Sequence, residues 1–330
     1  MRIAHITDLH FQRLDRASWR DLIGKRAIGA FNLRVLGRDK HFDERVAQCA
    51  VQSIADLKPD FVAITGDLSA LALDPEFDAA LQALSPLLES IPSLVIPGNH
   101  DIYTKDSRAR FEAKFGKWMG QRFPSGLQAK AFGDIMFVGM DCCRPTAIGS
   151  RGLVPYSQIH HLNQILAKQS DKRVVLLTHY PVVDHDGLAY HKKHTWHSIE
   201  NGKDLLSILS RSHRKPCMIL HGHAHRGFSA QFEGIPVHNP GSGGCSFASG
   251  VRQSAFNIYE LDADDIDPIM TRYVHDGSAI PARIRQEDFL LPITYYDNES
   301  TETLNPICKT CPRKQPEQNH YQVTIILWGR

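Results

Sequence analysis

The sequence predicts an α/β protein, and two observations indicate this class. Apolar runs of strand length recur along the chain, beginning with residues 3–6 and 61–64. Between them lie segments whose apolar residues follow helical spacing, as in residues 43–57 and 75–88. Helix, short turn and strand therefore alternate, which is the pattern of an α/β fold. With 330 residues, the chain can bury a large core in one elaborated domain or in two.

The remaining elements continue this alternation. Helical spacing predicts two more helices, over residues 108–123 and 156–167. Further strands are expected at residues 135–140, 228–232, 235–238, 255–261 and 269–273, of which 228–232 and 235–238 form a hairpin. From about residue 285 the periodicity fades. We therefore expect one domain over residues 1–285, followed by an irregular C-terminal appendage over residues 286–330.

Composition and charge exclude several classes of protein. Hydrophobic residues make up 42% and charged residues 22% of the chain, as in ordinary globular proteins. The net charge of +2 gives no general attraction to nucleic acid, so no duplex nucleic acid partner is expected. No apolar run approaches the ~18–20 residues of a transmembrane helix. Met1 leads straight into the first strand, and the seven cysteines are unevenly spaced. We therefore expect no signal peptide, reduced thiols and a cytoplasmic location.

Five of the strand-length runs end in a polar motif. These motifs are Thr7-Asp8-Leu9-His10, Thr65-Gly66-Asp67-Leu68, Pro97-Gly98-Asn99-His100-Asp101, Thr178-His179-Tyr180-Pro181 and His221-Gly222-His223-Ala224-His225. Loops at strand ends are where a rigid scaffold presents chemistry. Asp, His and Asn side chains are ligands suited to divalent Mn, Fe, Zn or Mg. Five such strand ends in one chain therefore indicate a metal centre.

The five motifs, in this order, resemble the calcineurin-like metallophosphoesterase superfamily. The pattern of that superfamily is D-x-H, G-D, G-N-H-D, a lone H and G-H-x-H, and here it spans Asp8 to His225. The resemblance implies an αββα sandwich, in which helices flank two facing mixed β-sheets and the metals lie at the strand C-termini. Periodicity alone does not separate this fold from a doubly wound sheet. The resemblance also implies an enzyme, a metal-dependent phosphoester hydrolase.

The resemblance further assigns ligands for two divalent metal ions, with Mn expected first and Fe, Zn or Mg as alternatives. Asp67 is expected to bridge the ions, because two close dications require an anion between them. The ligands of the first ion would be completed by Asp8, His10 and His225, and those of the second by Asn99, His179 and His223. Such a pair supplies a bridging hydroxide that attacks phosphorus, and it neutralises the phosphate oxygens.

His100 lies beside Asn99 but is not expected to bind a metal. It is the candidate that stabilises or protonates the leaving oxygen. Asp101 is expected to orient the His100 ring. Three further histidines lie close to the motifs but outside their ligand positions, and we assign them to the core or to the surroundings of the ligands: His5, His221 and His238.

The substrate is predicted only as a class. Cyclic-nucleotide-type phosphodiesterases share the G-N-H-D block, which favours hydrolysis of a phosphodiester or pyrophosphate bond in a small nucleotide-type substrate. The alternative is a UDP-2,3-diacylglucosamine pyrophosphatase of lipid A synthesis, although its best-known branch has Arg where this chain has His100. A more distant alternative is a catalytically inactive scaffold. Such members usually lose metal ligands or the leaving-group histidine, and all are present here.

Three further stretches carry open alternatives. Residues 17–40 have six basic and two acidic residues, a net charge of +4, interleaved with Trp19, Leu22 and Phe31. They predict either a helix-turn packed over the site, or a basic cap that grips a substrate phosphate or contacts an anionic membrane such as the inner membrane. Residues 184–198 contain four histidines and predict a long polar loop, with a substrate-facing role left open. Cys308 and Cys311 form a lone C-x-x-C, which is a weak zinc signal.

Overall fold

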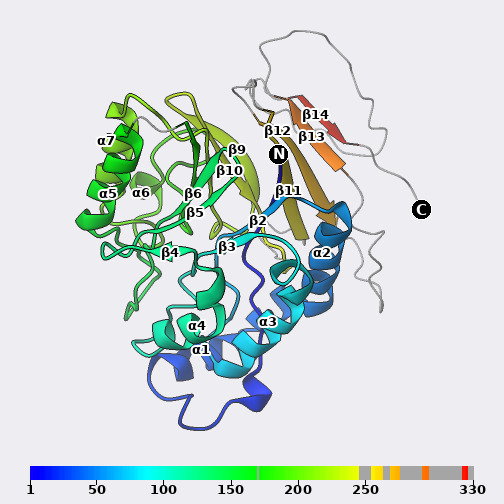
Figure 1. Ribbon diagram of the computed structural model, residues 1–330. Coiled ribbons are helices and arrows are strands. Elements are labelled where there is room, and N and C mark those ends of the chain that lie inside the picture. The colour runs from blue at the N-terminus through cyan, green and yellow to red at the C-terminus, as the bar shows by residue number, and fades with distance from the viewer. Residues whose placement is uncertain (169–170, 245–253, 263–267, 276–291, 297–321, 326–330) are drawn as a thin grey trace, which may run out of the picture.

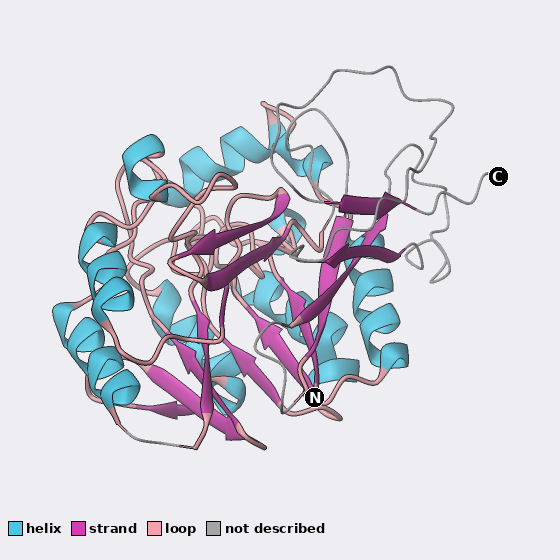
Figure 2. Cartoon of the chain, turned by 90° about the horizontal axis from the view of Figure 1, so that it is seen from above, coloured by secondary structure: helices cyan, strands magenta, loops and turns pink. Residues whose placement is uncertain are grey.

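Two facing sheets between layers of helices form the described part of the protein in this computed structural model (Figures 1 and 2). The structure describes residues 1–168, 171–244, 254–262, 268–275, 292–296 and 322–325. Seen from above, the strands occupy the centre of the molecule and helices lie on either side (Figure 2). The predicted sandwich of two mixed sheets is therefore confirmed, which periodicity alone did not distinguish from a doubly wound sheet.

The first sheet combines a parallel half with an antiparallel half. Its strand order is β14-β13-β12-β11-β1-β2-β3, and β1, β2 and β3 are parallel. The bounds are β1 Arg2–Ile6, β2 Phe61–Ile64, β3 Ser93–Val95, β11 Ser254–Glu260, β12 Ile269–His275, β13 Pro292–Tyr296 and β14 Gln322–Ile325. Strands β11 and β12 match the two expected last strands. The boundary at residue 285 stays a prediction, and β13 and β14 lie beyond it.

The second sheet carries the other strand-end motifs. Its order is β4-β5-β6-β7-β8-β10-β9, with β6, β7, β8 and β10 parallel. The bounds are β4 Gln121–Arg122, β5 Gln128–Phe132, β6 Ile135–Gly139, β7 Arg173–Leu177, β8 Met218–Leu220, β9 Gly227–Phe232 and β10 Ile235–Pro240. Strands β9 and β10 pair antiparallel, which confirms the predicted hairpin.

The helices cover the outer faces of both sheets. Their bounds are α1 Lys25–Arg34, α2 Glu44–Leu57, α3 Asp74–Leu88, α4 Ser107–Phe115, α5 Tyr156–Ala167, α6 Tyr190–Lys193 and α7 Gly202–Arg211, with short 3-10 turns at Leu14–Arg16, Arg38–His41 and Gly116–Trp118. The helices expected at 43–57, 75–88 and 156–167 are confirmed. The one expected over 108–123 is wrong in length. A 3-10 turn follows Phe115, and Gly120, at φ +67°, leads the chain into β4.

The two sheets meet through an apolar layer. Phe61 of β2 stacks on Phe137 of β6, with ring centroids 3.7 Å apart, and Val175 and Leu177 pack beside them. Most residues of these parallel strands are buried on both faces, which explains why their sequences are continuous apolar runs and not alternating ones. Because the sheets face each other, the carboxyl ends of β1, β2 and β3 lie opposite those of β7 and β8.

Helix α1 is anchored to the loop that follows β2. The Arg26 side chain is buried, and its guanidinium donates to the carbonyls of Leu71 and Ala72 and to the Asp106 carboxylate. Gly29 allows the close approach, since a Cβ there would lie 2.4 Å from the Leu71 side chain. Within residues 17–40, the expected helix-turn is therefore present. One of the six basic residues, Arg26, is buried and stabilises the packing of this helix.

Candidate metal centre

Five of the seven predicted ligands adopt a backbone conformation that side chains rarely take. Their φ angles lie between +52° and +68°, in the left-handed region. The five are Asp8, His10, Asp67, His223 and His225. Such strain clusters at functional sites, where the surrounding structure holds it in place. Here each strained residue lies within five positions of the end of a buried strand, in the loop that follows it.

A first cluster joins residues from both sheets. The His225 Nε2 atom lies 3.2 Å from Asp8 Oδ1, and the His10 Nε2 atom lies 3.0 Å from His225 Nε2. His10 Nε2 is also 3.7 Å from Asp67 Oδ2. The ligand atoms of these four residues all lie within 4.8 Å of one another. Asp8, His10, His225 and Asp67 thus form one group of potential ligands.

A second cluster shares Asp67 with the first. Its Oδ2 atom lies 3.4 Å from His179 Nε2, and the ligand atoms of Asp67, His179 and His223 lie within 4.8 Å of one another. Asn99 joins this group, because its Oδ1 atom is 3.0 Å from His179 Nε2. All seven predicted ligands therefore converge, and the same Asp67 oxygen faces both clusters.

Hydrogen bonds fix the orientation of the imidazoles. The Nδ1–H of His179 donates to the Thr65 carbonyl at 2.8 Å, which leaves Nε2 to face Asp67. The Nε2–H of His223 donates to the His197 carbonyl at 3.0 Å, which leaves Nδ1 to face the cluster. Bonds of this kind commonly orient histidines that bind metals. They leave the other ring nitrogen, Nε2 of His179 and Nδ1 of His223, to face the centre of the cluster.

The buried carboxylates of the two clusters, Asp8 and Asp67, would be stabilised by a cation. Asp8 Oδ1 is buried and has no hydrogen-bond partner among the residues that the structure describes. Burial opposes ionisation of Asp67, but the surrounding imidazoles, His179 foremost, outweigh it and hold the pKa of Asp67 below its ordinary value. Burial likewise opposes a charged His179, yet Asp67 and Asp8 raise the pKa of His179 to about 10. With protein groups alone, a proton on His179 offsets only part of the charge of the two carboxylates.

The donor set fits two divalent ions. Oxygens of two carboxylates and one amide and nitrogens of four imidazoles converge, and a metal would replace the proton on His179 because metal ligands bind in the deprotonated form. Asp67 would bridge the ions, Asp8, His10 and His225 would complete one site, and Asn99, His179 and His223 the other. A pair of ions held there activates water and neutralises the charge on a phosphoryl group.

His100 stands at the edge of the clusters with a different partner from the one predicted. Its Nδ1–H donates to the Ala70 carbonyl at 2.7 Å, and its backbone N–H donates to Asp67 Oδ1 at 2.7 Å. Because a carbonyl only accepts, Nδ1 carries a proton there, and Nε2 is the nitrogen that would exchange a proton with a substrate. The ring centroid lies 4.8 Å from that of His10. The position suits the predicted role at the leaving oxygen, which stays a prediction.

Asp101 accepts hydrogen bonds from the loops that follow β2 and β3. The Nδ1 atom of His100 has a different partner, the Ala70 carbonyl. Its buried carboxylate accepts from the backbone N–H groups of Gly98, Leu68 and Ser69 and from the Ser69 hydroxyl. Burial, reinforced by Asp67, raises the pKa of Asp101 to about 6. The expectation that Asp101 orients the ring directly thus needs correction. It ties the loop after β2 to the loop after β3, because four donors from these two loops point at it.

Comparison with known proteins agrees with this geometry. A family model described as calcineurin-like phosphoesterase matches residues 1–227. The chain belongs to this family. A probable cyclic nucleotide phosphodiesterase of Rhodopseudomonas palustris is 28% identical over 242 residues, which cover 72% of this chain and 76% of that protein. The phosphoesterase described here is accordingly a metal-dependent phosphoester hydrolase.

Solved structures share the fold of this phosphoesterase. A dimetal phosphatase from Danio rerio superposes with a TM-score of 0.55 at 16% identity, covering 82% of this chain and 94% of that one. The purple acid phosphatase PPD1 from yellow lupin, Lupinus luteus, superposes with a TM-score of 0.52 at 13% identity. That alignment covers 84% of this chain and 51% of the lupin protein. The likeness supports the sandwich architecture.

A cleft of about 590 Å³ opens above the metal centre of the phosphoesterase. Besides the predicted ligands Asp67, Asn99, His223 and His225, its lining includes Lys25, from the basic stretch 17–40, and residues that no sequence pattern marked: Tyr103, Arg144 and residues 146–150. The Lys25 ammonium lies 4.1 Å from the Tyr103 ring centroid, and burial lowers the pKa of Lys25. Apart from Lys25, these groups come from loops far apart in sequence, so local patterns gave no signal for them.

The histidine-rich stretch 184–198 divides between the cleft and a neighbouring ion-pair cluster. His194 and His197 line the cleft, and the His197 carbonyl holds His223. The buried Asp184 carboxylate contacts His185 at 2.9 Å and Arg226 at 2.9 Å. Only the short helix α6 interrupts the predicted loop.

Cys308 and Cys311 lie outside the described residues. Among the helices that the structure describes, none has the length and apolarity needed to cross a bilayer.

Proposed function

We propose that this phosphoesterase hydrolyses a phosphodiester or pyrophosphate bond in a small nucleotide-type substrate, with cyclic nucleotides favoured. The observation that carries the proposal is the convergence of the seven predicted ligands, four of which line a cleft of about 590 Å³. Cavities of ~300–1,000 Å³ suit small molecules. The relative from Rhodopseudomonas palustris, described as a probable cyclic nucleotide phosphodiesterase, supports the same choice.

The chain's own groups have distinct roles in this proposal. The phosphoryl group would rest over the two clusters, with His100 Nε2 placed to protonate the leaving oxygen. Lys25 and Arg144 add positive charge to the lining and would attract the anionic substrate. Arg144 is held by an ion pair with Glu200, so its guanidinium is already positioned. Tyr103 and Ile148 supply apolar surface beside these charges, against which a nucleobase would pack.

A substrate screen with the Mn-loaded enzyme tests the proposal. We expect hydrolysis of 3′,5′-cyclic AMP or cyclic GMP, loss of activity with EDTA and recovery when Mn is restored. Nucleotide diphosphates and UDP-2,3-diacylglucosamine are the comparison substrates. If the nucleotide lipid is cleaved with a kcat/KM at least ten-fold above that of every cyclic nucleotide, the cyclic-nucleotide assignment is wrong. Repeating the screen with Fe, Zn and Mg identifies the metal that supports turnover best.

One observation favours the second candidate, a UDP-2,3-diacylglucosamine pyrophosphatase acting at a membrane surface. Trp19, which precedes α1, is 73% exposed. Five more large apolar side chains in and around α1 are each more than half exposed: Ile23, Ile28, Phe31, Val35 and Leu36. The exposed Arg20 and Arg34 lie among them in sequence. Apolar and basic side chains together would bind anionic lipid, and Ile28 also lines the cleft, so a lipid substrate would have a short path to the metals.

A vesicle assay tests this second candidate. We expect wild type to sediment with phosphatidylglycerol vesicles, because buried apolar side chains add to ~1 kcal/mol per cation near an anionic surface. Trp19→Ser/Phe31→Ser should reduce sedimentation several-fold and leave hydrolysis of a soluble diester unchanged. Tyr156→Ser, which removes an equally exposed aromatic residue elsewhere, serves as the control and should sediment like wild type. Failure of wild type to sediment with these vesicles would remove the membrane-surface candidate.

A further inference from the structure

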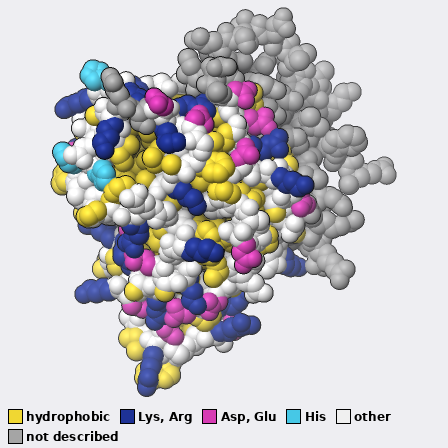
Figure 3. All heavy atoms as spheres, in the orientation of Figure 1, with side chains coloured by type: hydrophobic (Ala, Val, Ile, Leu, Met, Phe, Trp, Pro, Cys, Tyr) yellow, Lys and Arg dark blue, Asp and Glu magenta, His cyan; other side chains and the backbone are white. Residues whose placement is uncertain are grey.

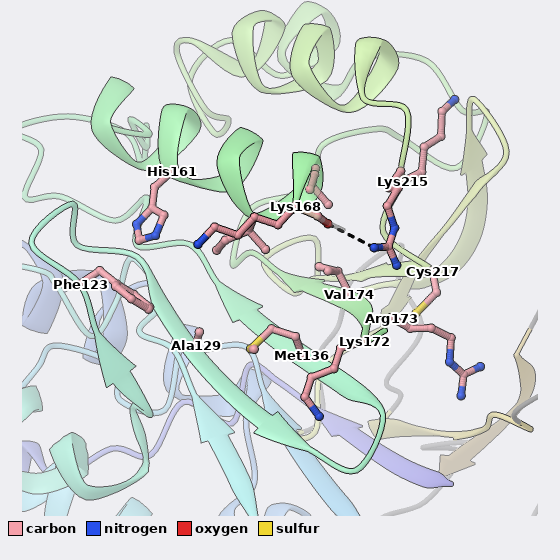
Figure 4. Close-up of a pocket in the computed structure, with 13 residues that line it drawn as sticks. Phe123, Ala129, Met136, His161, Lys168, Lys172, Arg173, Val174, Lys215 and Cys217 are labelled. Carbon is pink, nitrogen blue, oxygen red and sulfur yellow. Dashed lines mark hydrogen bonds between the residues drawn. The ribbon is translucent and has the colours of Figure 1, made fainter. Parts of the chain in front are cut away.

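A second cavity, of about 290 Å³, lies on the outer face of the second sheet. Its floor is formed by Ala129 of β5, Met136 of β6, Val174 of β7 and Cys217 just before β8. His161, Ile165 and Leu166 of α5 line the other side. In Figure 4, Met136 and Val174 lie on the strands beneath the helix that carries His161, and Lys168 extends between helix and strands.

The cavity exists because the helix layer ends before the sheet does. Val138, Leu176 and Ile219 form one row across β6, β7 and β8, and all three are fully buried in the same core as α5 and α7. The row that precedes it, Met136 and Val174 with Cys217 alongside, stays partly exposed. Helix α5 ends at Ala167. Beyond that end, no helix in the described part of the chain covers the apolar sheet surface.

Cations surround this apolar floor. Five of the lining residues are basic and none is acidic: Lys168, Lys172, Arg173, Arg214 and Lys215. Arg173 pairs with Asp134 at 2.7 Å, and Lys215 lies 3.6 Å from Glu233. Within the described part of the chain, Lys168 and Arg214 form no ion pair, and Arg214 donates to the Lys168 carbonyl. Figure 3 shows hydrophobic side chains gathered over this part of the second sheet, with Lys and Arg side chains around them.

We propose that this cavity binds a single-chain aliphatic carboxylate. The chain would lie on Met136 and Val174, and the carboxylate would sit between Lys168 and Arg214. An inorganic anion would leave the apolar floor against water, and a neutral hydrocarbon would leave the two cations without a counter-charge. The volume is near the lower limit for small-molecule sites, which selects a medium-length chain such as decanoate.

The cavity is separate from the catalytic centre. Strand β7 runs from Arg173 and Val174, in the cavity lining, to Leu177, two residues before His179. At about 3.3 Å per residue, the two sites lie roughly 15 Å apart along that strand. A ligand in the cavity therefore touches none of the metal ligands. Its binding can be measured without reference to turnover, so failure of this proposal would leave the proposed function unaffected.

Calorimetry on the full chain with decanoate is the first test. We expect saturable binding of one molecule, at least ten-fold weaker binding of decanol and none of decyltrimethylammonium. Each buried methylene strengthens binding about four-fold, so affinity should rise from hexanoate to decanoate and level off when the cavity is full. Equal binding of the anionic and cationic decyl compounds would overturn the proposal, as would no binding of decanoate.

A charge-reversed variant and a thiol footprint locate the site. Lys168→Glu/Arg214→Glu should weaken decanoate binding at least ten-fold. Both residues are exposed, so the fold should survive, which circular dichroism checks. Lys117→Glu/Lys203→Glu makes the same charge change at exposed positions outside the cavity and should bind like wild type. Decanoate should also slow alkylation of Cys217, followed by peptide mass spectrometry. Unchanged binding by the first variant, or unchanged Cys217 reactivity at saturation, would rule out this cavity as the site.

Discussion

Asp67→Ala should abolish nearly all phosphodiesterase activity. One oxygen of this carboxylate faces both ligand clusters, at 3.4 Å from His179 Nε2 and 3.7 Å from His10 Nε2. Without it, two dications would repel each other with no anion between them. We expect kcat/KM for bis-p-nitrophenyl phosphate to fall by roughly 10³-fold or more, about 4 kcal/mol in activation free energy. Elemental analysis should find fewer than two metals per chain.

A matched variant separates this effect from general loss of charge. Asp186→Ala removes a carboxylate that binds Lys193 and belongs to neither ligand cluster. It should retain two metals and wild-type turnover. The variant Asp67→Asn keeps the size of the side chain and tests whether the negative charge is needed. Wild-type turnover in Asp67→Ala would show that the assignment of the bridging residue is wrong.

His100→Ala should slow turnover strongly and leave the metal content near that of wild type. The ring is held at Nδ1 by the Ala70 carbonyl, so it can deliver a proton only through Nε2. General acid catalysis typically contributes ~10²–10⁴-fold, and we expect a loss in this range for alkyl leaving groups. For p-nitrophenol, which leaves without protonation, the loss should be much smaller. The ratio of the two rates is therefore the informative measurement.

Metal analysis distinguishes this role from ligation. His100→Ala should still bind two metals, because all seven ligands remain. His100→Gln offers a control that fills the space without supplying a proton, and it should show the same dependence on the leaving group. Loss of one metal equivalent in His100→Ala would place the ring among the ligands and remove the general-acid role. An equal loss of rate for good and poor leaving groups would also contradict that role.

The convergence of the predicted ligands could be expected because each lies within five residues of the end of a buried strand. Asp8 and His179, for example, are positioned by their own strands, and the order of the motifs identified the family. Asp101 shows the limit of this reasoning. The residue was marked by its motif, but its partners, Leu68 and Ser69, lie more than thirty positions away, where sequence spacing carries no information.

The cleft walls and some elements escaped prediction for different reasons. Lys25 lies in the basic stretch that the sequence marked, but its place with Arg144 in the cleft lining depends on α1 docking through the buried Arg26 and on Glu200 holding Arg144. Both contacts are long-range. Helix α7, in contrast, left a readable signal in the spacing of its buried residues Leu205 and Leu209. The helix expected to reach residue 123 failed because glycines after Phe115 outweigh its apolar spacing.

The division of the ligands between the sheets has a consequence for how the protein assembles. The first sheet supplies Asp8, His10, Asp67 and Asn99, and the second supplies His179, His223 and His225. Neither half alone offers a complete set of ligands for either ion. A bound ion is thus a cross-link between two layers that are distant in sequence, and its binding free energy adds to the stability of their contact. In a cell short of the metal, the enzyme would therefore lose both its catalytic ions and the cross-link that stabilises the contact between its sheets.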